Sequence, residues 1–507
     1  MSVYKPVVGV VGAGTMGRGI VQLFAEAGHE VRLFDAVEGA AVRGHGFIAD
    51  LLRRAVEKQR YTEAQAQAVM ARIRPTAALQ DLAGCAVIVE AIIEDLDAKR
   101  QLFGALEAFV ADDAILASNT SSLVVAEIAA GCRRPGRVAG LHFFNPVPLM
   151  KVVEVIAAVC TTPDTVERLR QLVTDAGHRA VVTADQPGFL VNHAGRGLYT
   201  EGLRILEEQV AGPAEVDTLM REAAGFRMGP FELLDLTGLD VSGKVMESIY
   251  EQFQQEPRFR PSSLIRPRIA AGLYGRKSGE GWYRYEGQTR LSGSGPVRSL
   301  PPVPAGLKIW ISREAPQREG IVALAQVADV EVVGEMQEAG LFVLQPWGLD
   351  ASSACVAQCL DASRTVALDP LPGLDKHRTL MLTAVTTPAA RDAALALFGS
   401  DGVPLTLIGD SPGFVVQRIL AMIVNIAANI AQRGIAQVQD IEDAVQLGLG
   451  YPMGPLSLGD AIGGARVLTI LRNIHALTND PRYRPSPWLL RRATLGISML
   501  TPEAQRT

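Results

Sequence analysis

The sequence predicts a four-part chain: an α/β domain, an all-α helical domain, a shortened α/β unit and a second copy of the helical domain. Two observations support this fold class. Over about the first 180 residues, short apolar runs alternate with amphipathic stretches, which is typical of a parallel sheet covered by helices. A repeat then relates the two halves, because three short motifs recur 225 residues further on. These are Thr161-Thr-Pro163 with Thr386-Thr-Pro388, Pro187-Gly-Phe189 with Pro412-Gly-Phe414, and Met228-Gly-Pro230 with Met453-Gly-Pro455.

Composition excludes several classes of partner. The chain has 507 residues, 48% of them hydrophobic, which is enough to bury several cores. A net charge of −5 without a dense basic face argues against nucleic acid, and the lack of any apolar run of about 18 residues argues against a membrane span. The five cysteines are scattered and complete no zinc site, so we expect no metal, reduced thiols and a cytoplasmic location.

The first strand and the turn after it predict a dinucleotide site. The apolar run Val7–Val11 leads directly into Gly12-Ala-Gly-Thr-Met-Gly17, which opens an amphipathic helix, and the next strand ends at Asp35. In this setting Gly12 makes the tight turn, Gly14 lets the backbone approach a pyrophosphate, and Gly17 lets helix and strand pack closely. The helix N-terminus favours the phosphates. Asp35 would bind a ribose 2′-hydroxyl and repel a 2′-phosphate, so this is a Rossmann-type domain that favours NAD over NADP.

Polar residues follow two further buried strands. Val87–Ile93 ends at Glu94, and the strand from Ile115 ends in a series of small polar residues that includes Asn119 and Ser121. Ligands of such sheets lie beyond the carboxyl ends of the strands, so these side chains should face the cofactor. Ser121 or Ser122 could equally be an N-cap of the next helix, and for Ser122 this interpretation is preferred.

A histidine and a glutamate are predicted to face each other across a hairpin. The hydrophobic runs Arg137–Phe144 and Lys151–Ala157 flank a turn with two prolines. If they pair as antiparallel strands, His142 lies nearly opposite Glu154, within hydrogen-bonding reach. A carboxylate that holds an imidazole makes a general base; the alternative is a surface histidine and a solvated glutamate.

Helices are expected over Ala40–Arg74, with a basic cluster of Arg53, Arg54, Lys58 and Arg60. This cluster is either a solvated helix face or a docking surface for a phosphorylated ligand. Pro187-Gly-Phe189 begins a mostly helical region, in which Asn192 is either a buried structural amide or a site residue.

The order of the motifs resembles that of the L-3-hydroxyacyl-CoA dehydrogenases over about residues 5–285. The motifs are Gly12-Ala-Gly-Thr-Met-Gly17, Glu90-Ala-Ile-Ile-Glu-Asp95, Ser118-Asn-Thr-Ser-Ser-Leu123, His142-Phe-Phe-Asn-Pro-Val-Pro-Leu-Met150, Pro187-Gly-Phe-Leu-Val-Asn192, Arg227-Met-Gly-Pro-Phe-Glu-Leu-Leu-Asp235 and Lys277-Ser-Gly-Glu-Gly-Trp-Tyr283. The resemblance implies NAD-dependent oxidation of a (S)-3-hydroxyacyl-CoA, with 3-hydroxybutyryl-CoA or 3-hydroxyadipyl-CoA as substrate.

The resemblance also implies roles for individual residues. His142 would be the general base, oriented by Glu154, while Asn192 and Ser121 would bind the substrate oxygens. Arg54 and Lys58 are expected at the CoA phosphates. The expected cofactor-binding residues are Gly12, Gly14, Thr15, Met16, Gly17, Asp35, Glu94, Lys99, Asn119, Asn145 and Lys277.

Two other functions compete with this one. A dehydrogenase of the 6-phosphogluconate or 3-hydroxyisobutyrate type needs a catalytic lysine near Asn192, and His193-Ala-Gly-Arg196 offers none. A non-catalytic NAD-binding protein would keep the glycine motif but has no need of the histidine, glutamate, asparagine and serine together.

The chemistry is not repeated in the second half. Asn192 corresponds to Gln417 and Glu154 to Thr379, while the stretch Arg364–Pro370, which corresponds to the surroundings of His142, has no histidine. Strands are expected at Leu307–Ser312 and Leu341–Leu344, and no glycine motif follows either. The predicted domains are 1–183, 184–285, a linker at 286–304, a degenerate Rossmann-like unit at 305–408 and the second helical copy at 409–507. The two helical copies are expected to form an internal pseudo-dimer, and a homo-oligomer is compatible with the pattern.

Overall fold

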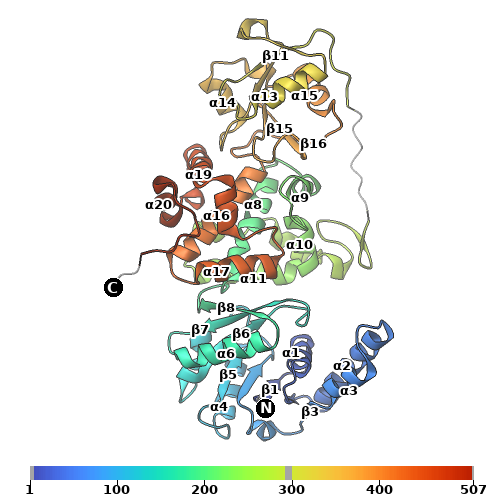
Figure 1. The fold of residues 1–507 in the computed structure, drawn as a ribbon, viewed down its shortest axis with the longest axis vertical. Helices are drawn as coiled ribbons and strands as arrows, with labels where there is room; N and C mark the ends of the chain where they lie inside the picture. The colour runs from blue at the N-terminus through green and yellow to red at the C-terminus, as the bar shows by residue number, and fades with distance from the viewer. Residues whose placement is uncertain (1–4, 292–299, 505–507) are drawn as a thin grey trace. The chain divides into compact units, whose positions relative to one another are not determined.

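The computed structural model describes residues 5–291 and 300–504, so residues 292–299 of the predicted linker lie outside the described part. The chain forms two compact units (Figure 1). One consists of Met1–His193 with Arg433–Leu449, and the other of Ala194–Gln432 with Gly450–Thr507. The predicted fold class is confirmed, whereas the predicted domain boundaries stay predictions.

An eight-stranded sheet forms the centre of the first unit, in the order β3-β2-β1-β4-β5-β6-β7-β8. All neighbouring strands are parallel except β6 and β7. The strands are β1 Val8–Val11, β2 Val31–Phe34, β3 Ile73–Pro75, β4 Val87–Glu90, β5 Ile115–Ser118, β6 Val138–Phe143, β7 Val152–Ala157 and β8 Arg179–Ala184. The central strands are almost wholly apolar because helices cover both faces of the sheet.

Helices of the first unit follow the strands. They are α1 Thr15–Glu26, α2 Ala40–Glu57, α3 Glu63–Met70, α4 Leu96–Leu106, α5 Val125–Ala129, α6 Pro163–Asp175 and α7 Val191–Ala194, with 3₁₀ turns η1 Leu79–Leu82 and η2 Pro135–Arg137. Figure 1 shows α2 and α3 next to each other beside α1. The helices predicted over Ala40–Arg74 are present, but the prediction is wrong at the end of this range. Thr62 caps α3 with its hydroxyl and so starts a separate helix, and Ile73 and Arg74 belong to β3.

A helix from the far end of the chain completes this unit. α17 (Val438–Leu449) packs against β8, and Ala184 donates its backbone N–H to Ile435 O at 2.8 Å. The guanidinium of Arg179 binds Asp440 at 2.6 Å and Asp443 at 2.7 Å. The second helical copy therefore supplies an element to the first sheet.

The second unit contains the remaining helices of both copies. They are α8 Arg196–Glu207, α9 Pro213–Glu222, α10 Pro230–Thr237, α11 Leu239–Gln252, α12 Ile265–Ala270, α16 Val416–Gln432, α18 Pro455–Ile462, α19 Gly464–Thr478 and α20 Pro487–Leu495. The shorter elements are η3 Pro257–Phe259, η4 Arg276–Ser278, η7 Pro481–Tyr483 and the hairpin of β9 Tyr285–Glu286 and β10 Thr289–Arg290.

The two copies meet where α8 packs on α16. A Cβ on Gly197 would lie 2.8 Å from Ile423 Cα, so the glycine allows the two helices to approach. Glu201, which is fully buried, receives ion pairs from Arg418 and Arg482 at 3.0 Å each. This contact is both tightly packed and charge-neutralised.

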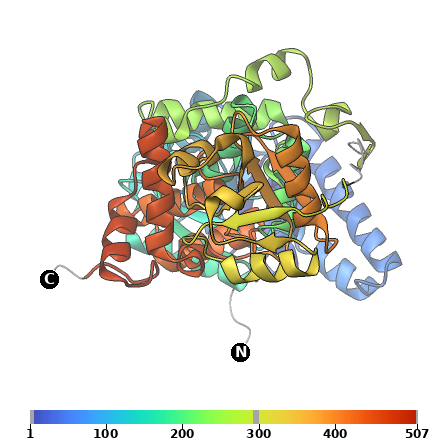
Figure 2. The same ribbon diagram turned by 90° about the horizontal axis from the view of Figure 1, so that it is seen from above.

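A second, six-stranded sheet belongs to the same unit, in the order β12-β11-β13-β14-β15-β16. Its strands are β11 Lys308–Ile311, β12 Glu331–Val332, β13 Leu341–Leu344, β14 Thr365–Leu368, β15 Arg378–Leu382 and β16 Leu405–Ile408; its helices are α13 Arg318–Val327, α14 Ala351–Ala357 and α15 Pro388–Gly399, with 3₁₀ turns η5 Met336–Glu338 and η6 Ala362–Arg364. Figure 2 shows these yellow and orange strands side by side, with helices packed along them. The predicted strands at 307–312 and 341–344 are confirmed.

None of the helices in the described ranges, 5–291 and 300–504, is both long and apolar enough to cross a membrane.

Candidate active site

The glycine turn after β1 has the geometry of a phosphate-binding loop. Gly12 has φ +106°, and a Cβ there would lie 2.4 Å from Ala91 O. A Cβ on Gly17 would lie 1.8 Å from Gly12 O, so α1 approaches the turn too closely for any side chain. At Gly14, the N-cap of α1, a Cβ would meet no described atom within 4 Å. The space above Gly14 and the exposed first turn of α1 fit a pyrophosphate.

Asp35 follows β2 and is bonded to this loop. Its carboxylate accepts the N–H of Ala13 at 2.7 Å and that of Val37 at 2.8 Å. The side chain is half-buried, so the carboxylate is fixed in orientation and remains within reach of a ligand. This arrangement suits a ribose hydroxyl donor and disfavours a second phosphate.

Glu94 organises the loop that follows β5. One carboxylate oxygen accepts the hydroxyl of Thr120 at 2.7 Å and the N–H of Ser121 at 2.9 Å. Burial on its own raises the pKa of Glu94, but these hydrogen bonds and the charge of Lys99 bring the pKa below its ordinary value. A charged Glu94 therefore holds Ser121 in place.

A buried ion pair lies below this loop, and the sequence did not indicate it. Lys99 is 1% exposed and binds Glu90 at 2.5 Å and Glu94 at 3.4 Å. Ser118 donates its hydroxyl to the other oxygen of Glu90 at 2.6 Å. A carboxylate at the end of a fully buried strand was the available sign, because such a charge needs a partner. In this structure Lys99 supports Glu94 from inside the protein.

His142 and Glu154 are directly opposed on β6 and β7, as predicted. His142 Nδ1 lies 2.5 Å from Glu154 Oε2. The other oxygen of Glu154 accepts the N–H groups of Leu190 at 2.9 Å and Val191 at 2.7 Å, at the start of α7. The carboxylate is fully buried and fixed by these bonds, so His142 donates from Nδ1 and keeps Nε2 as its proton acceptor.

The asparagines lie near this pair in the first unit. Asn119, directly after β5, accepts the N–H of Phe143 at 2.8 Å and so ties the ends of β5 and β6 together. Asn145 is exposed in the turn after β6. Asn192 is in α7, immediately after the two N–H groups that hold Glu154. β5, β6 and the start of β7 therefore bring together Asn119, His142 and Glu154.

The chain matches two family models. The model described as 3-hydroxyacyl-CoA dehydrogenase, NAD binding domain, matches residues 7–186, and the model of the C-terminal domain matches residues 188–285 and 413–498. The chain is 35% identical over 500 residues to the 3-hydroxyadipyl-CoA dehydrogenase of Escherichia coli (strain K12), covering 98% of this chain and 99% of that protein. The chain belongs to the 3-hydroxyacyl-CoA dehydrogenase family. It is an NAD-dependent oxidoreductase.

Solved structures of 3-hydroxyacyl-CoA dehydrogenases agree with this assignment. The structure of 3-hydroxybutyryl-CoA dehydrogenase from Escherichia coli K12 has a TM-score of 0.85 at 33% identity and covers 97% of this chain and 99% of its own. That of (S)-3-hydroxybutyryl-CoA dehydrogenase from Ralstonia eutropha, at 36% identity and TM-score 0.54, covers 56% of this chain and all of its own. The pig mitochondrial hydroxyacyl-coenzyme A dehydrogenase is 39% identical over 284 residues, 55% of this chain and 90% of that protein.

The predicted roles of Arg54, Lys58 and Lys277 stay predictions. Arg54 and Lys58 are exposed at the end of α2, where the neighbouring Arg53 pairs with Asp50 and Glu57 instead. Lys277 belongs to the second unit and binds Asp240 at 2.5 Å. In the described ranges no three His, Cys, Asp or Glu side chains converge as a metal site would require.

The second sheet carries an altered version of the dehydrogenase pair. The ladder between β14 and β15 places Asp369 opposite Thr379, so Asp369 stands in the position of His142. Gln417, the counterpart of Asn192, donates to Asp369 Oδ1 at 2.8 Å. Burial raises the pKa of Asp369 to about 6. The altered pair has no imidazole, and the carboxylate of Asp369 accepts a hydrogen bond from Gln417.

Proposed function

We propose that the chain oxidises the 3-hydroxyl group of a (S)-3-hydroxyacyl-CoA to a 3-oxo group, reversibly, with His142 as the general base. The observation that carries this proposal is the His142–Glu154 pair at the end of β6, in the domain that contains the phosphate-binding loop. The bound nicotinamide supplies the hydride chemistry.

His142 Nε2 would take the proton of the substrate hydroxyl as the hydride leaves carbon 3. The imidazolium that forms is then stabilised by Glu154, whose remaining lone pairs already bind two backbone N–H groups. Because Glu154 is fixed on three sides, the ring needs little reorganisation when charge appears.

Ser121 and Asn192 are proposed to bind the substrate oxygens, where negative charge grows during transfer. Asn119 and Asn145 would position the cofactor or the thioester carbonyl. Glu94, held by the loop after β5 and supported by Lys99, would act on the cofactor side through the position of Ser121. Arg54 and Lys58 remain proposed contacts of the CoA phosphates.

Two acyl groups are proposed, because full-length relatives differ in their named substrate. The Escherichia coli relative is named for 3-hydroxyadipyl-CoA, and the similar solved structure is named for 3-hydroxybutyryl-CoA. The test is kcat/KM, followed by NADH absorbance, for 3-hydroxybutyryl-, longer-chain and 3-hydroxyadipyl-CoA. NAD reduction with at least one of them is expected, and no reduction with any would contradict the proposal.

We also propose that the two helical copies act as an internal pseudo-dimer. The close contact of Gly197 with Ile423 and the ion pairs that join Glu201 to Arg418 and Arg482 support this arrangement. The five cysteines are free thiols, which supports a reducing compartment such as the cytoplasm.

A further inference from the structure

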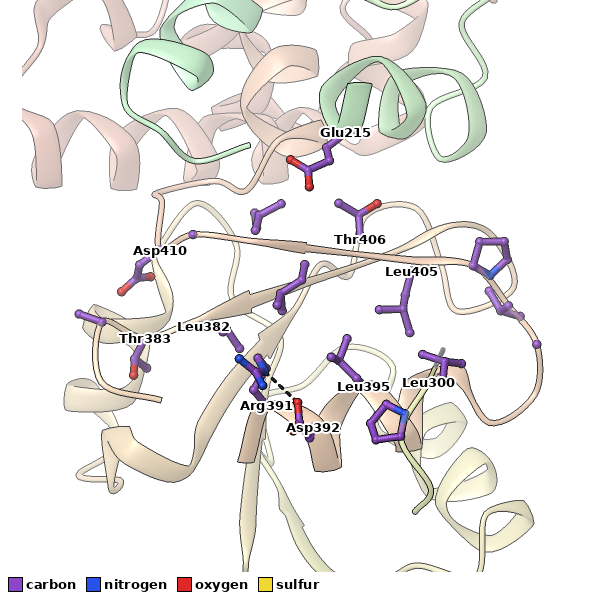
Figure 3. Close-up of a pocket in the computed structure, with 18 residues that line it drawn as sticks. Glu215, Leu300, Leu382, Thr383, Arg391, Asp392, Leu395, Leu405, Thr406 and Asp410 are labelled. Atoms are coloured by element: carbon purple, nitrogen blue, oxygen red, sulfur yellow. Dashed lines mark hydrogen bonds and ion pairs between the residues drawn. The ribbon is translucent and has the colours of Figure 1, made fainter. Parts of the chain in front are cut away.

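A second candidate site lies in the second unit, at the edge of the six-stranded sheet. A cleft of about 1170 Å³ runs along β16, the edge strand. Figure 3 shows Thr406 and Glu215 at one end of this cleft, and Arg391 paired with Asp392 at the other. Five leucines, Leu300, Leu382, Leu395, Leu405 and Leu407, give the cleft an apolar lining.

Thr406 is hydrogen-bonded to a histidine, which in turn is bonded to a carboxylate. His377 Nε2 lies 2.8 Å from Thr406 Oγ1, and His377 Nδ1 lies 2.6 Å from Glu222 Oε2. The carboxylate of Glu222 can only accept a hydrogen bond, so His377 Nδ1 carries the proton and donates it to Glu222. His377 Nε2 then accepts the hydrogen bond of the threonine hydroxyl. A hydroxyl, an imidazole base and an orienting carboxylate in this order are the parts of a nucleophilic triad.

The first copy shows that the fold does not need polar residues here. At an offset of 225 residues, Val152 and Val181 correspond to His377 and Thr406 of the second copy, and Leu447 of the second copy corresponds to Glu222 of the first. Val152 and Val181 are fully buried, so ordinary packing fills these positions. His377 and Thr406 are therefore particular to the second half, and their burial carries a cost in desolvation that packing alone does not explain.

An oxyanion would also find a donor at this edge. One side of β16 pairs with β15, where Pro404 O accepts the N–H of Arg378. On the opposite, outer side, the N–H of Gly409 donates to Val210 O. Strand residues alternate between the two sides, so the N–H of Leu407, the residue after Thr406, faces outward along the cleft. The N–H after a nucleophile is a common oxyanion donor.

We propose that this cleft binds uncharged, activated acyl esters and that Thr406 is acylated there. Thr406 Oγ1 attacks the acyl carbonyl carbon and passes its proton to His377 Nε2. The C–O bond to the leaving group then breaks, and the leaving oxygen takes that proton. Water repeats the sequence to release the carboxylic acid and restore the threonine. Glu215, Asp392 and Asp410 outnumber Arg391 around the cleft, which disfavours anionic acyl-CoA.

The test uses the full chain with p-nitrophenyl acetate, following release of p-nitrophenol and locating acetyl groups by peptide mass spectrometry. Wild type should acetylate Thr406 and hydrolyse the ester about 10²-fold faster than Thr406→Val or His377→Gln. Glu222→Gln should be intermediate, and Thr406→Ser should retain activity. Dehydrogenase turnover, which should be unchanged in all four variants, reports on folding.

Two results would overturn the proposal. One is equal ester hydrolysis by wild type, Thr406→Val and His377→Gln. The other is acetylation confined to other residues, such as lysines or Thr383, which lines the same cleft and donates its hydroxyl to Ala362 O. If Thr406→Val fails to fold, Thr406→Ser and His377→Gln with the mapped acetyl group still decide the question.

Discussion

Glu154 combines two functions in one buried carboxylate: it orients His142 and it receives the first N–H groups of α7. Glu154→Gln keeps one side-chain oxygen, which can accept a hydrogen bond either from His142 or from the N–H groups of α7. The substitution removes the negative charge that stabilises the imidazolium. A charge-assisted hydrogen bond contributes about 1.5–3 kcal/mol, so kcat should fall about 10- to 100-fold. The pH profile of kcat should shift as well. Steady-state kinetics over a pH series measures both, and an unchanged profile would contradict the orienting role.

Asp369 makes the second sheet sensitive to pH. Burial disfavours the charged form of Asp369 and raises its pKa from the ordinary value of 3.8 to about 6 in the folded protein. Between pH about 4 and about 6, Asp369 keeps its proton in the folded protein but loses it in the unfolded chain. The free energy of unfolding therefore falls as the pH rises through this range and stays lower above it. The shift corresponds to about 3 kcal/mol. Asp369→Asn should be more stable than wild type at pH 7 in urea unfolding and should lose this slope.

Exposed Asp375 provides the matched control. Asp375→Asn should leave the pH dependence of the unfolding midpoint as it is in wild type. An equal slope in wild type and Asp369→Asn would show that Asp369 titrates at its ordinary value in the folded protein.

At the residue scale, the sequence predicted the pairs that depend on local geometry. The opposition of His142 and Glu154 follows from strand alternation around one turn, which short-range pattern reveals. The Glu90–Lys99 pair and the Glu222–His377–Thr406 series join residues from separate elements. No periodicity encodes these contacts, because tertiary packing decides which side chains share a buried space.

The turn between β1 and α1 gives a matched pair of glycine substitutions. Gly17→Ala places a methyl group against Gly12 O and should cost about 3 kcal/mol of stability. Gly14→Ala meets no described atom, so the protein should fold normally but bind NAD about 10-fold more weakly, through loss of the close approach to the phosphates. Thermal melting and NAD titration separate the two effects. Equal NAD affinity in Gly14→Ala and wild type would contradict the assigned phosphate loop.

At the element scale, strand and helix types were predicted well and long-range partners were not. β1, β2, β5, β11 and β13 lie where apolar runs predicted them. β3 was missed because Ile73 and Arg74 form a strand only by pairing with β2. The attachment of α17 to β8 was also missed, since the amphipathic pattern of α17 shows that it buries one face but not which surface it covers.

The duplication makes the second half a structural partner of the first at the scale of the whole molecule. A fragment of residues 1–290 lacks Arg418 and Arg482, which neutralise buried Glu201, and exposes the α8 face around Gly197. This fragment should self-associate or aggregate, because an apolar face with an uncompensated carboxylate needs a cover. Size-exclusion chromatography with light scattering measures this. A monomeric, fully active fragment would count against the internal pseudo-dimer.

The repeat was visible in sequence because turn motifs recur at a constant offset, and so was the loss of the histidine from the second copy. The replacement of His142 by Asp369 became visible only with the register of β14 and β15, since the offset of the strands cannot be read from short motifs. One proposed catalytic pair and one altered pair in a duplicated fold is the arrangement on which the functional account depends.

The most direct test of this account is the kcat of His142→Gln with a 3-hydroxyacyl-CoA, measured beside NAD binding by fluorescence titration. The account predicts a loss of about 10³-fold in kcat with NAD affinity near that of wild type, because His142 transfers the proton while the β1–α1 loop holds the cofactor. Turnover near the wild-type rate would contradict it.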